Sequence, residues 1–447
     1  MIFGSLIMYK KPDITKSTAL LEKALEIIPK GTQTASKCYN QFVRGVHPVF
    51  VDKAKGCYIW DIDGNKYIDH VMSLGPIMLG YNHPRTNKAI INQLKKGTIF
   101  SLPHESEVEL AQLITETVPC AEMVRFGKNG SDVTTIAVRI ARHLKGKDHI
   151  LSPEGHYHGW GDIFAAVSTR DYGLPKSMKE LVERFPYNNL EALEEKLKTG
   201  KFACLIMEPT LLEAPAPGFL QGVRDLCTKY DAILIFDEMV TGFRWSLGGA
   251  QAYYGVTPDM ATFGKACANG MPISILAGKK EVMAGLEQVF FSGTYLGDAL
   301  SIAASIETIK ELRDNKDVIY KHIWEQGALI QKTFNDECDR LKIDGKMVGL
   351  GPVFNVKFMM DDAQGAKDLF HQEMVKNGIF WGNAVYVTWA HQPKDIQKTL
   401  KAIKKSLKVV AKAVKKNLID STLEGERSAA IFTRTIITEP KKKWERV

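Results

Sequence analysis

The stretch "ILIFDEMVTGF", residues 233–243, contains four apolar residues that run directly into two carboxylates, Asp237 and Glu238. A short apolar run of this kind is typical of a strand buried on both faces of a parallel sheet. Charged side chains at the end of such a strand are costly to bury unless they have partners. The stretch therefore predicts a parallel sheet and raises the question of what pairs with two carboxylates at its edge.

Apolar runs of this kind alternate with amphipathic helical segments from about residue 105 to 310. This alternation is the mark of a parallel sheet with helical crossovers. The runs are "DHILSP" (148–153), "FACLIMEP" (202–209), "DAILIFDE" (231–238) and "ISILAG" (273–278). We therefore predict an α/β fold in which residues 71–335 form a large domain around a mostly parallel, doubly wound sheet.

The segments on either side predict a second, smaller unit. "STALLEKALEIIP" (17–29) has helical spacing, and "GCYIWDIDGNKYIDHV" (56–71) forms two alternating runs around an Asp-Gly pair, a strong hairpin signal. We assign both to an N-terminal segment, residues 1–70, that joins a small α+β domain, residues 336–447.

The C-terminal domain is expected to end in a long helix and a tail. Its strand and helices are predicted from "NVKFMM" (355–360), "AKDLFHQEMVKNG" (366–378) and "DIQKTLKAIKKSLKVVAKAVKK" (395–416). The lysine-rich face of the last helix is most simply a solvated face. We expect residues 418–447 to form an extended tail that lies on the body of the protein or on a partner.

Composition narrows the class of protein. Of the 447 residues, 45% are hydrophobic and 25% are charged, as in soluble globular proteins with a large core. The net charge of +8 comes from basic residues spread along the chain and not gathered with aromatic residues, so we predict no nucleic-acid partner. No uninterrupted apolar stretch is long enough to span a bilayer, and we expect no membrane partner.

The cysteines and the N-terminus indicate the compartment. Seven cysteines are an odd number and none forms a CxxC pair, which favours a reducing compartment and argues against zinc or a disulfide framework. The first residues, "MIFGSLIMYKK", lack the basic region and the cleavage site of a signal peptide. We therefore expect a cytoplasmic protein.

Nucleotide chemistry is an alternative for the apolar run followed by Asp237 and Glu238, because a Walker B strand looks the same. That assignment requires an upstream GxxxxGK[ST] loop, which the sequence lacks. No GxGxxG follows a predicted strand either. Both an ATPase and a dinucleotide enzyme are therefore disfavoured.

Lys265 lies in a glycine-flanked turn, "ATFGKACANGMPISILAG" (261–278), 28 residues after Asp237. Removing such a lysine from water makes its amine a nucleophile toward carbonyl groups. Taken alone, however, a lysine in a loop is ordinarily a surface lysine.

A possible phosphate site lies in "RFGKNGSDVTTIAVRIARHL" (125–144), where Gly130 and Ser131 open an amphipathic helix. Free N–H groups at a helix start, with glycine for close approach, bind phosphate. An ordinary N-cap is the simpler explanation when this stretch is considered alone.

The stretch "EGHYHGWGD" (154–162) contains two histidines, His156 and His158, two residues apart. A metal site is possible, but no third ligand is obvious, and we predict no metal. Tyr157, in a glycine-flanked turn, can lie flat on a ring.

Together these residues are the parts that pyridoxal phosphate needs, namely a lysine for its aldehyde, a carboxylate for its pyridine nitrogen, a phosphate site and an aromatic ring that stacks. On this interpretation Asp237 faces the pyridine nitrogen and keeps it protonated, so that the ring stays an electron sink. The pyridinium in turn holds Asp237 ionised.

The motifs and their order resemble the class III (fold-type I) aminotransferases, and within them most closely the glutamate-1-semialdehyde 2,1-aminomutase family. The resemblance spans roughly residues 30–415. It is carried by "PVFVDKAKGCYIWDIDGNKYIDHV", "GPIMLGYNHP", "NGSDVTTIAVRIAR", "GHYHGWGD", "IFDEMVTGFR", "FGKACANGMP" and "SGTYLGDALSIAA".

This resemblance implies roles for the matched positions. Lys265 corresponds to the lysine that holds the cofactor, and Asp237 to the aspartate of the pyridine nitrogen. Tyr157 corresponds to the stacking aromatic. The phosphate pair is Gly130 and Ser131, and Asn129 replaces the serine that the family places before them. Thr294 corresponds to a threonine that reaches the phosphate from the other subunit, which implies a homodimer with shared active sites.

The chain departs from the aminomutase pattern around the substrate. Met239 stands where the family usually has a valine on the second face of the ring. The aminomutase's substrate arginine is replaced by Lys37, its tryptophan by Leu74, and its late glutamate by Asn383. Glu213 instead matches an acidic residue of other class III enzymes.

No arginine occurs from residue 341 to 426, where many aminotransferases hold an α-carboxylate with a bidentate arginine. This pattern favours a carbonyl substrate without a carboxylate clamp, such as an aldehyde or keto sugar used in polysaccharide or small-molecule synthesis. We therefore predict a pyridoxal-phosphate-dependent aminotransferase with a small-molecule amino donor. Two alternatives stay open: the aminomutase itself and, from another class, a non-catalytic pyridoxal-phosphate-binding relative.

Overall fold

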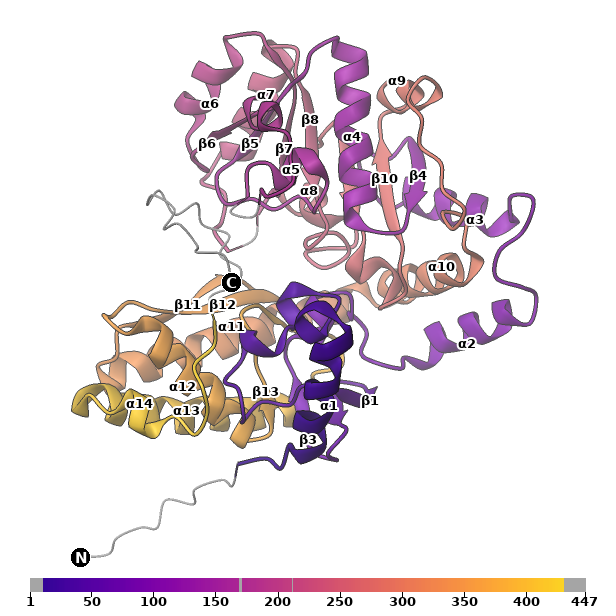
Figure 1. Ribbon diagram of the computed structural model, residues 1–447. Coiled ribbons are helices and arrows are strands. Elements are labelled where there is room, and N and C mark those ends of the chain that lie inside the picture. The colour runs from indigo at the N-terminus through magenta and orange to yellow at the C-terminus, as the bar shows by residue number, and fades with distance from the viewer. Residues whose placement is uncertain (1–10, 169–170, 211, 430–447) are drawn as a thin grey trace, which may run out of the picture.

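The apolar run that ends in Asp237 forms strand β8, at the centre of a seven-stranded sheet (Figure 1). The computed structural model describes residues 11–168, 171–210 and 212–429. The order of the strands is β4-β10-β9-β8-β7-β5-β6. Their bounds are β4 (Met123–Gly127), β5 (His149–Pro153), β6 (Val182–Phe185), β7 (Phe202–Met207), β8 (Ile233–Asp237), β9 (Met260–Phe263) and β10 (Ser274–Gly278).

Both faces of this sheet are buried, because side chains along each strand alternate between two apolar clusters. Ile233 and Ile235 pack in the cluster of α4 (Gly130–Lys145), and Leu234 and Phe236 pack in the cluster of the opposite face. On the first face α4 is accompanied by α5 (Asp162–Ala165) and α9 (Lys280–Met283). The second face is covered by α3 (Glu105–Thr115), α6 (Leu190–Leu197), α7 (Phe219–Lys229) and α10 (Ala299–Asp314). The predicted doubly wound sheet is therefore confirmed.

Strand β10 departs from the parallel arrangement predicted from its apolar run. It pairs antiparallel with both β9 and β4, whereas β8 pairs parallel with β7 and β9. Only residues 264–273 join β9 to β10, and a parallel return needs a crossover of a dozen or more residues. The short connection therefore forces the chain to turn back, and the sheet is mostly, not wholly, parallel.

A second sheet joins the N-terminal segment to the C-terminal part of the chain. The predicted hairpin is confirmed, because β2 pairs antiparallel with β3. β13 then adds in parallel to β3, which links residue 68 to residue 379. The strands of this sheet are β1 (Val51–Lys55), β2 (Tyr58–Asp61), β3 (Lys66–Asp69) and β13 (Ile379–Phe380).

The first helix, α1, covers Thr15–Ile27 and so begins two residues before the predicted start. The backbone N–H groups of Lys16 and Ser17 donate to the carboxylate of Asp63, at 2.6 and 3.0 Å. Asp63 lies in the turn of the β2–β3 hairpin. The helix start is therefore determined by a partner 46 residues away, not by the local serine and threonine.

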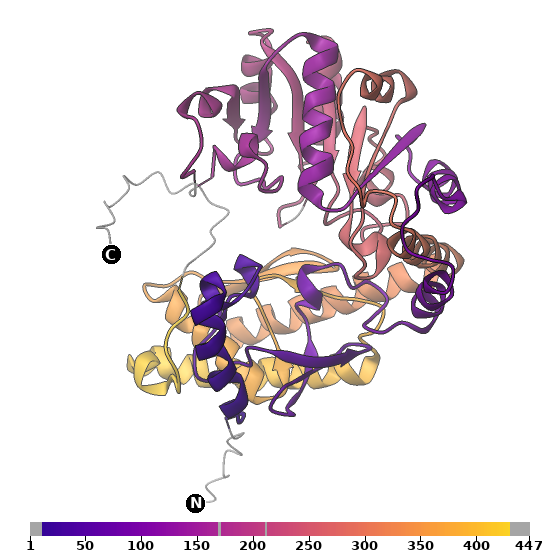
Figure 2. The ribbon, with the colours of Figure 1, turned by 45° about the vertical axis from the view of Figure 1, so that its right-hand side comes forward.

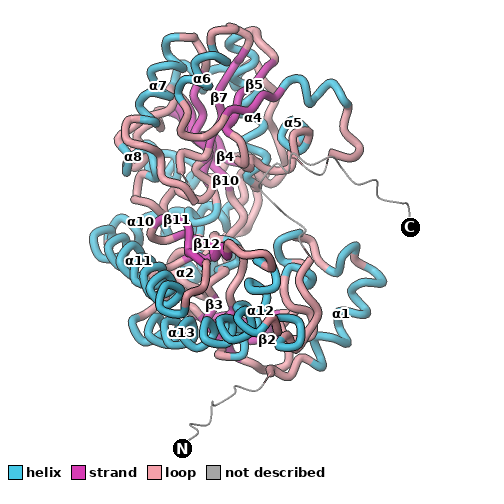
Figure 3. Tube along the Cα trace, turned by 90° about the vertical axis from the view of Figure 1, so that its left-hand side faces the viewer, coloured by secondary structure: helices cyan, strands magenta, loops and turns pink. Residues whose placement is uncertain are grey.

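The C-terminal elements and the N-terminal segment lie side by side in one lobe, below the large sheet (Figures 2 and 3). The lysines of α13 are all exposed, as predicted for a solvated face. The remaining elements are α2 (Pro84–Leu94), α8 (Gly249–Tyr254), α11 (Lys316–Leu341), β11 (Gly345–Leu350), β12 (Val353–Phe358), α12 (Ala363–Lys376), β14 (Val385–Tyr386), α13 (Pro393–Lys416) and α14 (Ile419–Thr422). The domain boundaries after residues 70 and 335 stay a prediction.

The C-terminal tail lies on the body of the protein as far as residue 429, but its beginning is not extended. Residues 419–422 form the short helix α14. Glu426 then pairs with Arg44 through backbone hydrogen bonds of 3.0 Å in both directions and through their side chains. The rest of the predicted tail, residues 430–447, lies outside the described residues. In the part of the chain that is described, no helix is long and apolar enough to cross a membrane.

Four histidines are buried in the lower lobe, and burial lowers the pKa of each. His47 is 3% exposed, and its pKa falls from 6.5 to about 4 because of burial, against a hydrogen bond to the Val43 carbonyl. A group whose pKa is lowered on folding contributes stability that is complete above its unfolded pKa. That stability is lost as the pH falls from about 6.5 toward 4.

We therefore predict that His47→Gln makes the protein less sensitive to acid. Between pH 7 and 4.5 the free energy of unfolding should fall by about 2.5 kcal/mol less in the variant than in the wild type. Equilibrium urea unfolding measures this difference. The matched control is His143→Gln, since His143 is exposed; a loss as steep in His47→Gln as in this control would contradict the prediction.

Candidate active site

The carboxyl ends of β8 and β9 bring Asp237 and Lys265 to the same edge of the sheet. Asp237 is opposite Thr262 in the parallel register, and Lys265 follows three residues later, after Gly264. Lys265 begins the 3₁₀ turn Lys265–Ala268 with a left-handed φ of 42°. Such conformations are uncommon for residues other than glycine and cluster at functional sites.

The carboxylate of Asp237 is buried and held from three directions. Its Oδ1 atom accepts from Thr262 Oγ1 at 3.2 Å and from the backbone N–H of Met239 at 3.1 Å. Its Oδ2 atom is 2.7 Å from Nδ1 of His158. With only 2% of its surface exposed, the side chain has a single orientation, as a group that must face one ring atom requires.

His158 is the partner of Asp237 that sequence reasoning missed. It is buried, its Nε2 lies 3.0 Å from Ser152 Oγ, and its backbone carbonyl accepts from Thr134 at 2.7 Å. The only signal was its alternation with His156 in "GHYHG", which suggested a metal. Among the described residues, no group of three or more His, Cys, Asp or Glu side chains is placed to hold a metal ion.

Glu238, the second carboxylate at the end of β8, is also buried and also has partners. Its carboxylate accepts from the backbone N–H groups of Ala250 and Gln251, from the Gln251 side chain and from Thr241. Burial raises its pKa, against these four hydrogen bonds. A Cβ atom at Gly249, which has a φ of 78°, would collide with this carboxylate. Glu238 therefore holds the loop to α8.

Gly130 and Ser131 lie in the first turn of α4, next to this edge of the sheet. The carboxylate of Asp132 accepts from the backbone N–H groups of Lys128 and Asn129, at 2.9 and 2.8 Å. The hydroxyl of Ser131 accepts from the backbone N–H of Trp160 at 2.9 Å, which ties the loop after His158 to the helix start. The helix end thus presents its positive pole beside Asp237 and Lys265, as a phosphate site requires.

Met239 connects these loops. Its Sδ atom would lie 3.0 Å from a Cβ atom at Gly130 and 2.9 Å from one at Gly264, so the two glycines let this side chain pack closely against both loops. Tyr157 is 44% exposed, and its backbone N–H donates to Glu208 at 3.2 Å. Met239 follows Asp237 by two residues, and Tyr157 precedes His158, the partner of Asp237, so both residues are adjacent in sequence to this pair.

The tentative substrate residues are placed differently from one another. Lys37 is exposed, and its Nζ donates to Ser73 Oγ at 3.1 Å. Glu213 is exposed and accepts from Asn188 at 3.0 Å, while Asn383 is exposed after β13. Thr294, which the resemblance assigns to the cofactor phosphate of the other subunit, is exposed in the loop before α10. Of the three substrate candidates, Lys37 contacts a turn with an unusual backbone.

The turn that Lys37 contacts, residues 72–74, is strained. Met72, Ser73 and Leu74 are consecutive left-handed residues, with φ of 47°, 55° and 72°. This conformation costs roughly 1–2 kcal/mol per residue and persists only where the surroundings hold it. The carboxylate of Asp69 accepts from the backbone N–H groups of Val71 and Met72 and thereby holds the entry to the turn.

Arg244 holds the other end of this turn and was not predicted to have a role. It is fully buried, and it donates to the carbonyl of Gly75 at 2.5 Å and to that of Val387 at 3.3 Å. Its guanidinium lies 5.3 Å from the ring centroid of Tyr386. Burial lowers its pKa to about 10, so it remains charged at neutral pH. Arg244 thus links the loop after β8 to both the turn and the small domain.

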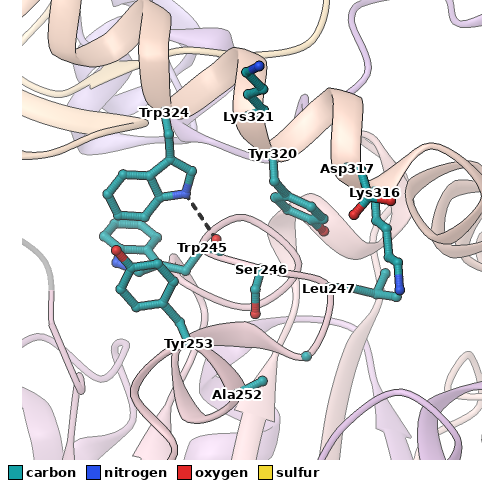
Figure 4. A pocket seen from close by; sticks show the side chains of 11 residues that line it. Trp245, Ser246, Leu247, Ala252, Tyr253, Lys316, Asp317, Tyr320, Lys321 and Trp324 are labelled. Atoms are coloured by element: carbon teal, nitrogen blue, oxygen red, sulfur yellow. Dashed lines mark hydrogen bonds between the residues drawn. The ribbon is translucent and has the colours of Figure 1, made fainter.

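A separate groove of about 750 Å³ lies between α8 and α11 (Figure 4). Tyr253 and Trp324 stack there with ring centroids 5.0 Å apart, and Trp324 donates to the carbonyl of Trp245. None of the predicted site residues lines this groove.

The assembled site has the donor set that pyridoxal phosphate requires, because a lysine, a buried carboxylate and a helix N-terminus meet at one sheet edge. The family model that matches the chain is that of the class-III aminotransferases, over residues 40–407. The chain belongs to the class-III aminotransferase family. The predicted family, fold type and cofactor are thereby confirmed.

Relatives of this aminotransferase carry two kinds of name. The glutamate-1-semialdehyde 2,1-aminomutase 2 of Lachnoclostridium phytofermentans is 36% identical over 429 residues, covering 89% of this chain and 100% of that protein. The 3-aminobutyryl-CoA aminotransferase of Cloacimonas acidaminovorans is 36% identical over 422 residues, covering 91% and 100%. The pyridoxal-phosphate form of the Sphingopyxis sp. MTA144 FumI protein superposes with a TM-score of 0.84 at 26% identity, covering 90% and 98%. Aminotransferase and aminomutase activities are therefore both compatible with this similarity.

The two neighbouring carboxylates should respond to mutation in opposite ways. Asp237→Asn removes a charge at nearly constant shape, so turnover should fall roughly a hundredfold or more while the melting temperature changes little. Glu238→Ala leaves buried donors without a partner and should lower the free energy of unfolding by about 3 kcal/mol. Cofactor-saturated turnover and thermal unfolding measure the two effects. Native turnover in Asp237→Asn would refute the assignment of Asp237.

Proposed function

We propose that this aminotransferase moves an amino group from a small-molecule donor to an aldehyde or keto acceptor, such as a sugar or polysaccharide precursor, and is not the aminomutase. The observation that carries the proposal is the contact between Lys37 and Ser73, in the turn of residues 72–74. We call Lys37 and this turn the substrate corner, because Lys37 and Leu74 stand there in place of the aminomutase's arginine and tryptophan. A lysine binds a carboxylate as a point charge and lacks the planar fork of an arginine. The arginine-free stretch from 341 to 426 supports the same conclusion.

The proposed roles in catalysis follow from position. Pyridoxal phosphate, when bound, supplies a carbonyl for amine exchange and a ring that accepts electrons. Lys265 would hold its aldehyde and, once displaced, carry the proton at the substrate carbon. Asp237 would face the ring nitrogen, Tyr157 and Met239 the two ring faces, and Gly130 and Ser131 the phosphate. This intact set argues against a non-catalytic relative, and conversion of the bound cofactor to its amine form by an added amino donor decides that alternative.

The role of Lys265 predicts a labelling result. Borohydride reduction of the cofactor-loaded enzyme should attach the cofactor covalently to the peptide that contains Lys265, as peptide mass spectrometry detects. Lys265→Ala should retain cofactor through the phosphate and ring contacts, yet turn over at less than about a thousandth of the native rate. A label on any other lysine would exclude Lys265.

Aminomutase activity is tested by its own substrate. The pyridoxamine form of the enzyme is supplied with glutamate-1-semialdehyde, without any other donor or acceptor, and 5-aminolevulinate is measured over time. Losing two or three substrate contacts of about 1–3 kcal/mol each slows such a reaction by orders of magnitude. We expect no sustained formation of product. Efficient turnover would make the aminomutase the function.

We also propose a homodimer in the cytoplasm. All seven cysteines are unpaired and buried, in keeping with a reducing compartment. Large apolar side chains are exposed at the end of α2 and in the loops that follow α2 and precede α10, which meet where Ala299 donates to the carbonyl of Thr98 at 2.9 Å. An exposed apolar patch of this kind marks an interaction surface. Its members are Leu94, Ile99, Phe100, Leu102, Phe290 and Tyr295, and the exposed Thr294 lies among them.

The shared site makes cofactor affinity depend on assembly. Sedimentation of the cofactor-bound enzyme should show a dimer or larger species. Leu102→Asp, in the apolar patch, should shift the protein toward monomer and weaken cofactor binding by about tenfold or more. The control is Leu418→Asp, an exposed leucine in the lower lobe. An active monomer would refute the shared site.

A further inference from the structure

Two side chains lie directly behind His158. Its Nε2 atom is 3.0 Å from Ser152 Oγ, and Arg184 Nη1 donates to the same hydroxyl at 3.1 Å. Ser152 lies on β5 and Arg184 on the neighbouring β6, paired in the parallel register. A continuous chain of hydrogen bonds therefore joins Arg184 to Asp237 through Ser152 and His158.

The number of hydrogens in this chain decides its direction. A guanidinium only donates, so Ser152 accepts from Arg184 and has one hydrogen left to give. The other nearby acceptor, the carbonyl of Pro153, is 3.5 Å from Ser152 Oγ, at the limit of a hydrogen bond, and it accepts a shorter one from Arg184 at 2.8 Å, whereas Nε2 of His158 is only 3.0 Å from the hydroxyl. The hydroxyl hydrogen therefore points to Nε2 of His158. The imidazole then carries its own hydrogen on Nδ1 and donates it to Asp237.

We infer that Arg184 and Ser152 are positioning residues that keep His158 as the neutral Nδ1–H tautomer, so that Asp237 meets the cofactor's ring nitrogen as an anion that no neighbouring imidazolium compensates. A protonated His158 would form an ion pair with Asp237 and weaken its hold on the ring nitrogen. This inference rests on the proposed function of Asp237.

Arg184 is buried and charged, as a residue that acts on the protonation of His158 must be. Burial lowers its pKa to about 10, against the influence of Glu154, so the guanidinium is still cationic at neutral pH. Its charge, two hydrogen bonds from His158, disfavours a second positive charge there. Its Nε atom is buried without a partner, which is unfavourable for stability.

The test compares pyridoxamine phosphate with benzyl phosphate, which keeps the ring and the phosphate but lacks the ring nitrogen and the other ring substituents. Binding of pyridoxamine phosphate and of benzyl phosphate to the cofactor-free enzyme is measured by calorimetry. Arg184→Met and Ser152→Ala should each weaken the binding of pyridoxamine phosphate about tenfold and leave the affinity for benzyl phosphate unchanged. The double variant should be no weaker than either single variant, because the two residues act in series. Arg184→Lys, which keeps the charge, should restore part of the affinity.

Arg142→Met is the matched control, because Arg142 also has a buried nitrogen without a partner and donates to a backbone carbonyl, that of Asp148. A second readout is the ¹⁵N spectrum of histidine-labelled protein, with His158 assigned by its loss in His158→Asn. The wild type should show the neutral Nδ1–H form, and Arg184→Met a shift toward imidazolium.

Equal weakening of both ligands in Arg184→Met would overturn the inference, and so would a wild-type His158 that is already imidazolium. If Asp237→Asn leaves the affinity for pyridoxamine phosphate unchanged, the proposed role of Asp237 itself fails. If Asp237→Asn weakens binding and Arg184→Met does not, the inference fails alone.

Discussion

The burial of two adjacent carboxylates at the end of β8 is the constraint on which the rest of the site depends. Asp237 is the last residue of the strand and Glu238 the first after it, and the two side chains have separate partners. Glu238 gathers four donors and fixes the loop that leads to α8. Asp237 is left to face the site with His158 behind it. Glu238 fixes the loop after β8, and this fixed loop helps to keep the Asp237 carboxylate in one position.

Much of this arrangement could be predicted from the sequence, because it depends on local pattern. The apolar runs of β5, β7 and β8 are buried on both faces, and such runs are visible without a structure. The partner of a buried carboxylate is not visible, since His158 reaches Asp237 across 79 residues. Likewise, the reversed direction of β10 depends on the length of its connection, not on its own residues. Long-range contacts of this kind carry no local signature.

The substrate corner shows how strain and charge are combined. Three left-handed residues are held between the Asp69 carboxylate and the Arg244 guanidinium. The sequence comparison located Lys37 and Leu74 here, but neither propensity nor motif indicated a strained turn, because none of residues 72–74 is a glycine. Arg244 also spans from the β8 loop to Val387, so this corner and the small domain are positioned by one buried cation.

The parallel pairing of β3 with β13 has a consequence for how the chain is made. Ile68 can pair with Ile379, and Arg44 with Glu426, only after the later residue of each pair has been synthesised. During synthesis the seven-stranded sheet is complete once residue 278 has left the ribosome. The lower lobe, in contrast, consists of the first and the last parts to emerge, and contacts so distant in sequence form slowly. The N-terminal hairpin therefore exposes its unpaired edge for most of translation, and the lobe that carries Lys37 closes last.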